Sequence, residues 1–231
     1  MVSDGIGPSS GSFMAVMAET IVVTAGVLAI IRFLHASSAV SLQWLAIPAV
    51  LVTAALAPAW IGKREFPRLG LNLSQGSLVA ATVGGVCLCV LPAVFLGLWV
   101  LTQLNLPVPL RPIVPERQGW PAWLLYQFFY VAVAEEVFFR GYVQGNTTKW
   151  LRQFTRLPRL APAGIAIFVS AACFALAHVV VQGQITAALT FVPGLVLAWL
   201  FIRTGSLLAP ILFHGVANVS YAVIALTLAH P

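Results

Sequence analysis

Long apolar runs dominate the chain and are separated by short polar segments. A helix needs about 20 mostly apolar residues to cross the hydrocarbon core of a bilayer, because it rises only about 1.5 Å per residue. Seven stretches meet this requirement, which predicts an all-α polytopic membrane protein, a bundle of seven to eight transmembrane helices. They run from about Phe13 to Leu34, Val40 to Ile61, Gly76 to Gln103, Ala122 to Gly145, Pro162 to Val181, Gln184 to Ile202 and Ser206 to Leu228.

The segments between these runs are polar or rich in Pro and Gly. Residues 1–12 are rich in Gly and Ser, which predicts a disordered tail. Gly62–Gln75 and the Pro-rich Leu104–Pro121 are typical of exposed loops. Asn146–Leu160 mixes basic with bulky apolar side chains, so it is either a helix in the headgroup region or a charged loop.

Prolines and glycines give packing cues inside the runs. Pro48 and Pro58 are expected to kink the second span, and Pro193-Gly194 indicates a helix break in the sixth. The pair Gly84-Gly85 is the one obvious cue for close approach of two helices.

Composition excludes an ordinary soluble domain. Hydrophobic residues make up 60% of the chain and charged residues 8%, with a mean hydropathy of +0.97. The net charge of +6 comes mostly from Lys and Arg in loops, which in a membrane protein indicates orientation and not nucleic-acid binding. Their distribution favours a cytoplasmic amino terminus. No cleaved signal peptide and no organellar or retention signal is expected, so the default location is a prokaryotic inner membrane.

The most unusual stretch is VAVAEEVFFRGY, residues 131–142, which places two carboxylates and an arginine in the fourth run. An ionisable side chain inside a bilayer costs at least about 2.5–3.5 kcal/mol, so three together indicate a partner, a cavity or a function. Glu136 and Arg140 are four residues apart and share a helix face, which predicts an ion pair. Glu135 is rotated by about 100° from Glu136, so it points elsewhere and is the candidate for chemistry.

Later spans carry their own polar groups. In FALAH, Phe174 and His178 share a helix face, and in HGVAN the same is true of His214 and Asn218. Singly, each of these can be a packing or hydrogen-bonding residue. Together with the carboxylates they provide a base, imidazoles and an amide on three helices, a set suited to hydrolysis by an activated water.

These three motifs resemble those of the CPBP family of CAAX proteases and bacteriocin-processing enzymes, also called Abi or Rce1-like proteins. EEVFFR matches the family's EExxxR, FALAH its FxxxH and HGVAN its HxxxN, in the family's order, over roughly Trp120–Tyr221. The resemblance implies an intramembrane glutamic endopeptidase whose site lies among the last four helices. Residues 122–231 would then be the catalytic core, following the transmembrane helices and loops of residues 13–121.

The resemblance also implies a role for each motif residue. Glu135 would activate the water with the help of His178, and His214 with Asn218 would stabilise the oxyanion. Glu136 and Arg140 would shape the site and balance its charge, while Phe174 would pack beside His178. No cofactor and no metal is implied, and the substrate would be a membrane protein or a lipidated peptide. Its identity and the oligomeric state are left open.

Three alternatives use the same residues differently. Two His and one Glu can hold a zinc ion, although an arginine beside the carboxylates opposes a dication and no HExxH motif occurs. A proton-coupled transporter would use the polar residues as an ion pathway, with helix breaks at Pro193-Gly194 and Pro210. A non-catalytic immunity factor would keep the fold without the hydrolysis.

Overall fold

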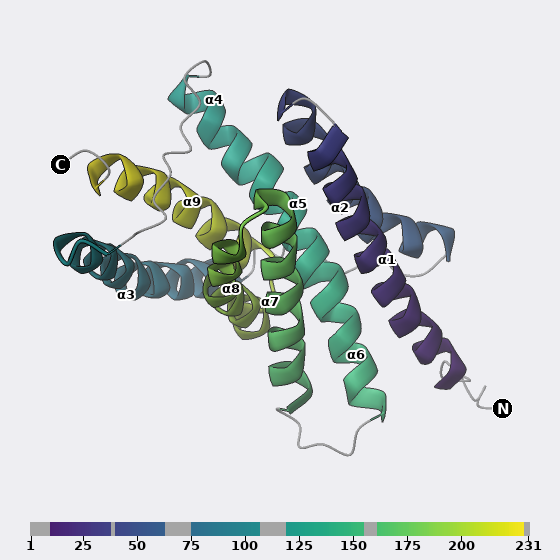
Figure 1. Cartoon of the computed structure of the whole chain (residues 1–231). Helices are drawn as coiled ribbons and strands as arrows, with labels where there is room; N and C mark the ends of the chain where they lie inside the picture. The colour runs from purple at the N-terminus through teal and green to yellow at the C-terminus, as the bar shows by residue number, and fades with distance from the viewer. Residues whose placement is uncertain (1–9, 38–39, 63–74, 107–118, 155–160, 229–231) are drawn as a thin grey trace. The chain divides into compact units, whose positions relative to one another are not determined.

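The computed structural model describes residues 10–37, 40–62, 75–106, 119–154 and 161–228, which are almost entirely helical (Figure 1). The described elements, in chain order, are α1 (Ser10–Ser37), α2 (Val40–Ile61), α3 (Gly76–Gln103), α4 (Trp120–Leu125), η2 (Tyr126–Ala132), α5 (Val133–Glu136), η3 (Val137–Gln144), α6 (Gly145–Phe154), α7 (Ala161–Gln182), η4 (Ile185–Thr190), α8 (Phe191–Thr204) and α9 (Leu208–Leu228).

Six helices of the described chain are long and apolar enough to cross a membrane. They cover Met14–Ala36, Gly76–Gln103, Trp120–Gln153, Ala161–Gln182, Ile185–Thr204 and Leu208–Leu228, and Leu45–Ile61 is a shorter apolar helix. The predicted all-α, polytopic architecture is confirmed, and the chain is a multi-pass integral membrane protein. The tail and loop predictions fall mostly on residues 1–9, 63–74 and 107–118, which lie outside the described residues.

The fourth span is longer than the sequence pattern predicts. Helix continues without interruption from Trp120 to Phe154, so the described part of the basic stretch is helix and not a loop, and its position in the headgroup region stays a prediction. Thr147 and Thr148 support this continuation, because their hydroxyls donate to the carbonyls one turn back at 2.8 Å. Leu151 is buried, which gives α6 an apolar face to pack. Residues 155–160 lie outside the described part of the chain.

The expected helix breaks at proline are wrong in two of the spans. Pro193 lies in the first turn of α8 and Pro210 in the first turn of α9. In a first turn the missing N–H of proline costs little, since that donor has no intrahelical acceptor anyway. These prolines therefore begin helices, and the sixth span opens with the 3₁₀ segment η4. Pro48 and Pro58 lie inside α2, and the kink expected there stays a prediction.

The chain forms two compact units, and each is described by itself. Unit 1 contains residues 1–68 and 138–195, and unit 2 contains residues 69–137 and 196–231. In unit 1, α1 packs against α2, α6 and α7, and α6 runs beside α7 (Figure 1). In unit 2, α9 packs against α3, η2 and α5.

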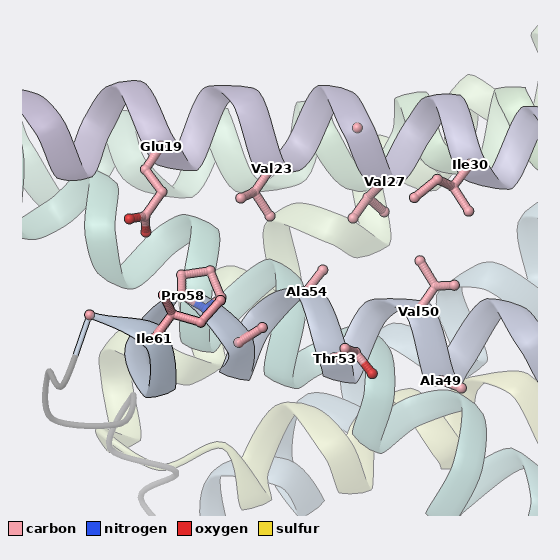
Figure 2. A pocket seen from close by; sticks show the side chains of 13 residues that line it. Glu19, Val23, Val27, Ile30, Ala49, Val50, Thr53, Ala54, Pro58 and Ile61 are labelled. Carbon is pink, nitrogen blue, oxygen red and sulfur yellow. The ribbon is translucent and has the colours of Figure 1, made fainter.

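Polar contacts join α1 to the fourth span in unit 1. The hydroxyl of Tyr142 donates to Glu19 Oε1 at 3.3 Å, and Asn146 Nδ2 donates to Thr20 Oγ1 at 3.0 Å. Such side-chain bonds hold helices together in lipid, where apolar burial supplies little driving force. Glu19 also lies at one end of a cavity of about 750 Å³ between α1 and α2, whose other lining is mostly apolar (Figure 2).

Glycine allows close approach at two places that the sequence does not mark. A Cβ added to Gly215 in α9 would lie 2.3 Å from two ring atoms of Phe128, and one added to Gly194 would lie 3.3 Å from atoms of Ala171 and Phe174. By contrast, a Cβ at Gly84 or Gly85 would meet no atom within 4 Å. The predicted close-packing role of that pair is therefore wrong for the described structure.

Candidate functional site

Two π-helical segments flank the carboxylates of the fourth span. η2 and η3 are π-helices, and the single α-helical turn between them, α5, carries Glu135 and Glu136. A π-helix bonds residues five apart, so it changes the direction in which the following side chains point relative to an unbroken α-helix. π segments are frequent at functional sites for this reason. None of this departure from α-helix is visible in the apolar sequence of the span.

His214 lies between the two carboxylates in unit 2. Its Nδ1 is 2.8 Å from Glu136 Oε1, a short hydrogen bond, and its Nε2 is 3.7 Å from Glu135 Oε2. The side chain of Glu136 is fully buried and that of His214 is 6% exposed, whereas that of Glu135 is 17% exposed. Glu135 is thus the carboxylate that a ligand can approach.

The two contacts of His214 restrict where its protons lie. An ionised carboxylate accepts hydrogen bonds and donates none, so with Glu136 in that form the hydrogen in the short contact belongs to Nδ1. Nε2 then either carries a lone pair or, in the imidazolium, donates a second hydrogen. Glu135 Oε2 is shielded from solvent and makes no hydrogen bond to another described residue. At 3.7 Å, His214 Nε2 and Glu135 Oε2 are within the range of an ion pair but beyond hydrogen-bond distance.

Asn218 lies one helical turn beyond His214 on α9 and bonds to a residue that no motif includes. Its Nδ2 donates to Gln127 Oε1 at 2.9 Å, and Gln127 is buried in η2. Sequence reasoning missed Gln127. The signal that marks it is a lone amide side chain in the otherwise apolar run that leads to Glu135.

The remaining motif residues form a second cluster in unit 1. The guanidinium of Arg140 is fully buried, donates from Nη2 to the carbonyl of Gly194 at 3.1 Å, and lies 4.5 Å from the centre of the Phe174 ring. Phe174 packs edge-on against Phe139 and contacts the ring of His178, with centroids 4.4 Å apart. Cation–π contact and a carbonyl acceptor thereby stabilise a charge that is removed from water.

His178 has a defined tautomer in this cluster. Its Nδ1 lies 3.0 Å from the carbonyl oxygen of Phe174, one turn back on α7. A carbonyl only accepts, so Nδ1 carries the hydrogen and the neutral ring has its lone pair on Nε2. Nε2 is therefore the atom of His178 that can accept a proton or hold a water.

The structure thus places the predicted residues in two groups. Glu135, Glu136 and His214 lie together in unit 2, with Asn218 on the same helix as His214. Arg140, Phe174 and His178 lie together in unit 1. The ion pair of Glu136 with Arg140 and the cooperation of His178 with Glu135 stay predictions.

Metal binding was a possible alternative for these residues. In the part of the chain that the structure describes, no group of three or more His, Cys, Asp and Glu side chains has a geometry that could hold a metal ion. In the carboxylate site one imidazole nitrogen, Nδ1 of His214, is already bonded to Glu136.

A family comparison matches the segment that carries these motifs. The model of the family described as type II CAAX prenyl endopeptidase Rce1-like matches residues 117–220, a little under half of the chain. Residues 117–220 are similar to the Rce1-like family. The predicted resemblance over Trp120–Tyr221 is thereby confirmed, and this family suggests an intramembrane endopeptidase. No curated protein and no solved structure matches the chain.

The Rce1-like segment contains both groups of side chains. It begins before α4 and ends within α9, so it includes the carboxylates, both histidines and Asn218. It also includes Gln127, which lies outside the three motifs. Helices α1 to α3 precede it.

Proposed function

We propose that the protein is an intramembrane endopeptidase that hydrolyses a peptide bond with a water activated by Glu135. The observation that carries the proposal is the position of Glu135, whose side chain is 17% exposed while that of Glu136 is fully buried, and whose Oε2 lies 3.7 Å from His214 Nε2. A carboxylate in such a position can accept a proton from water in the step that forms the new C–O bond. The Rce1-like match over residues 117–220 supports the reaction class.

His178 is assigned to the same water. The lone pair on its Nε2, which follows from the bond of Nδ1 to Phe174, can hold the water and later carry a proton to the leaving amine. This pairing with Glu135 rests on the FxxxH motif, because a hydrolase of this kind needs a second group to move the proton from attack to departure.

His214 and Asn218 are assigned to the oxyanion. His214 would donate from Nε2 to the oxyanion, and Glu136 holds the ring through its 2.8 Å contact with Nδ1. Asn218 supplies an amide N–H. Each donor to a developing oxyanion is worth about 3 to 4 kcal/mol of transition-state stabilisation.

Glu136 and Arg140 are assigned to structure and charge balance. Both side chains are fully buried. Glu136 orients His214, whereas Arg140 contacts the carbonyl of Gly194 and the Phe174 ring. No metal or other cofactor takes part in the proposed reaction.

The substrate we propose is a membrane-associated protein cut near its carboxyl terminus or in a membrane segment. The similarity to type II CAAX prenyl endopeptidases over residues 117–220 makes a lipidated peptide one suitable form of it. We also propose a prokaryotic inner membrane with the amino terminus in the cytoplasm, supported by the basic residues between the spans.

The test uses purified protein in liposomes with a farnesylated CaaX peptide and with a transmembrane peptide as substrates. The proposal predicts that the wild type cleaves one of them, that Glu135→Gln does not, and that EDTA leaves the rate unchanged. Loss of activity in EDTA with recovery in zinc would make the enzyme a metalloprotease. Cellular function that survives Glu135→Gln would show that hydrolysis is not its task.

A further inference from the structure

Gln127 is a buried amide in the middle of a membrane span. It is 5% exposed and lies in the π-helical segment η2, two turns before the carboxylates. An amide side chain in lipid needs a partner, since an unsatisfied polar group costs free energy there. Its partner is Asn218, which donates from Nδ2 to Gln127 Oε1 at 2.9 Å.

This bond uses one of the two hydrogens on Asn218 Nδ2 and leaves the other for a ligand. Asn218 is half-buried, whereas Gln127 is enclosed. The bond to Gln127 therefore holds the Asn218 amide in place, and its second N–H points away from Gln127.

Fixing the amide matters because its last torsion is soft. Rotation about the terminal bond of Asn is broad and nearly two-fold, so a free amide can exchange its NH₂ group and its oxygen. An oxygen turned toward a developing oxyanion repels it, whereas an N–H stabilises it. Gln127 Oε1, which accepts a hydrogen bond from Nδ2, selects the orientation in which the NH₂ group can face the oxyanion.

The helices that carry the pair approach closely. A Cβ at Gly215 would lie 2.3 Å from ring atoms of Phe128, the residue that follows Gln127. Gly215 is three residues before Asn218, so this contact sets the distance across which Gln127 reaches the amide.

We propose that Gln127 is a positioning residue, which orients the Asn218 amide so that an N–H faces the oxyanion. The proposal rests on the proposed function for its effect on rate. Gln127 does not touch the substrate. It acts by accepting a hydrogen bond from Asn218.

Three variants test this role with a farnesylated CaaX peptide in liposomes. Gln127→Met keeps the size of the side chain but removes the hydrogen-bond acceptor. Its kcat should fall at least about tenfold, toward the roughly 100- to 1,000-fold fall that removal of an oxyanion donor causes, and its KM should stay within twofold of the wild type. Gln127→Glu keeps an accepting oxygen and should retain most of kcat. Gln103→Met, at the exposed end of α3, is the matched control and should leave both constants unchanged.

The direction of the bond is decided by the same series. If Gln127 were instead the donor to Asn218, the carboxylate of Gln127→Glu would face an oxygen and would lower kcat as much as Gln127→Met. That result would overturn the proposal. A kcat of Gln127→Met within twofold of the wild type would do the same.

A measurement without substrate separates this proposal from the proposed function. Melting temperatures of Gln127→Met, Asn218→Leu and the double variant should be non-additive, because each single change removes the same bond. Additive shifts would mean that the two side chains are not coupled and would refute the positioning role. If the wild type cleaves neither the farnesylated nor the transmembrane peptide, the proposed function fails, and the melting cycle still decides whether Gln127 holds Asn218.

Discussion

Gly215→Ala should damage catalysis far more than stability. The added Cβ would lie 2.3 Å from two ring atoms of Phe128, whereas carbon atoms in contact prefer about 3.5–4.0 Å. The ring or the helix must therefore move by more than about 1 Å. Overpacking of this kind costs about 1–3 kcal/mol, and the gain in helix propensity from Gly to Ala returns about 1 kcal/mol. The net loss of about 0–2 kcal/mol corresponds to a fall in Tm of at most roughly 8 °C.

Activity is more sensitive to the same displacement. Gly215 follows His214 directly, and a misplacement of about 1 Å in a catalytic group can cost about 100-fold in rate. The assay is kcat for peptide cleavage in liposomes together with Tm in detergent. Gly84→Ala is the matched control in unit 2, because its Cβ would meet no atom within 4 Å, and it should keep the wild-type rate. A Gly215→Ala rate within twofold of the wild type would show that the Phe128 ring simply turns aside and that this contact does not hold the site.

Three further predictions follow from the described contacts. Glu135→Gln should abolish turnover with little change in Tm. Arg140→Met should lower Tm clearly, because it removes the bond to Gly194 and the contact with Phe174 in a dry site. Equal Tm values for the two variants would contradict this prediction. His178→Ala and His214→Ala should each reduce the cleavage rate at least about 100-fold. Combined with Glu135→Gln, either change should lower the rate little further. A double variant whose loss of rate is the product of the two single losses would show that the residues do not act as one unit. Glu136→Gln should retain part of the activity, because the amide oxygen of the new side chain can still accept a hydrogen bond from His214 Nδ1, whereas Glu136→Leu should lose the activity. Identical rates for the two variants would mean that this bond has no role in catalysis.

The helices were predictable because they depend on a strong local signal. Gly76–Gln103 begins and ends where the apolar run predicts, and the other spans agree within a few residues at most of their ends. Lipid requires every backbone group to be satisfied within the helix, so long apolar runs have few other options. The fourth span is the exception, because α6 is amphipathic and extends the helix past the apolar part.

The contacts within the site were less predictable, because they depend on helix geometry that composition does not encode. The motifs identified Glu135, Glu136 and His214. They did not show that the Nδ1 atom of His214 would contact Glu136 and its Nε2 atom Glu135. The π-helical segment η2 precedes α5 and changes the direction in which the two carboxylates point. A pattern of apolar letters is the same for α- and π-helix.

Close packing shows the same limit of sequence patterns. A Gly-Gly pair in α3 looked like a contact site but touches no atom within 4 Å, whereas a single glycine in HGVAN meets Phe128. Gln127 was overlooked because one amide in an apolar run has no partner in the sequence. Its partner lies 91 positions away, and only the packing of α9 on η2 brings the two together.

The central claim is that Glu135 drives hydrolysis of a peptide bond in a membrane-associated protein. The most direct measurement is mass spectrometry of the carboxyl termini of membrane proteins from cells that produce either the wild type or Glu135→Gln at equal level. The account predicts a set of new carboxyl termini that appear only with the wild type. Identical sets of termini in both cells would contradict it.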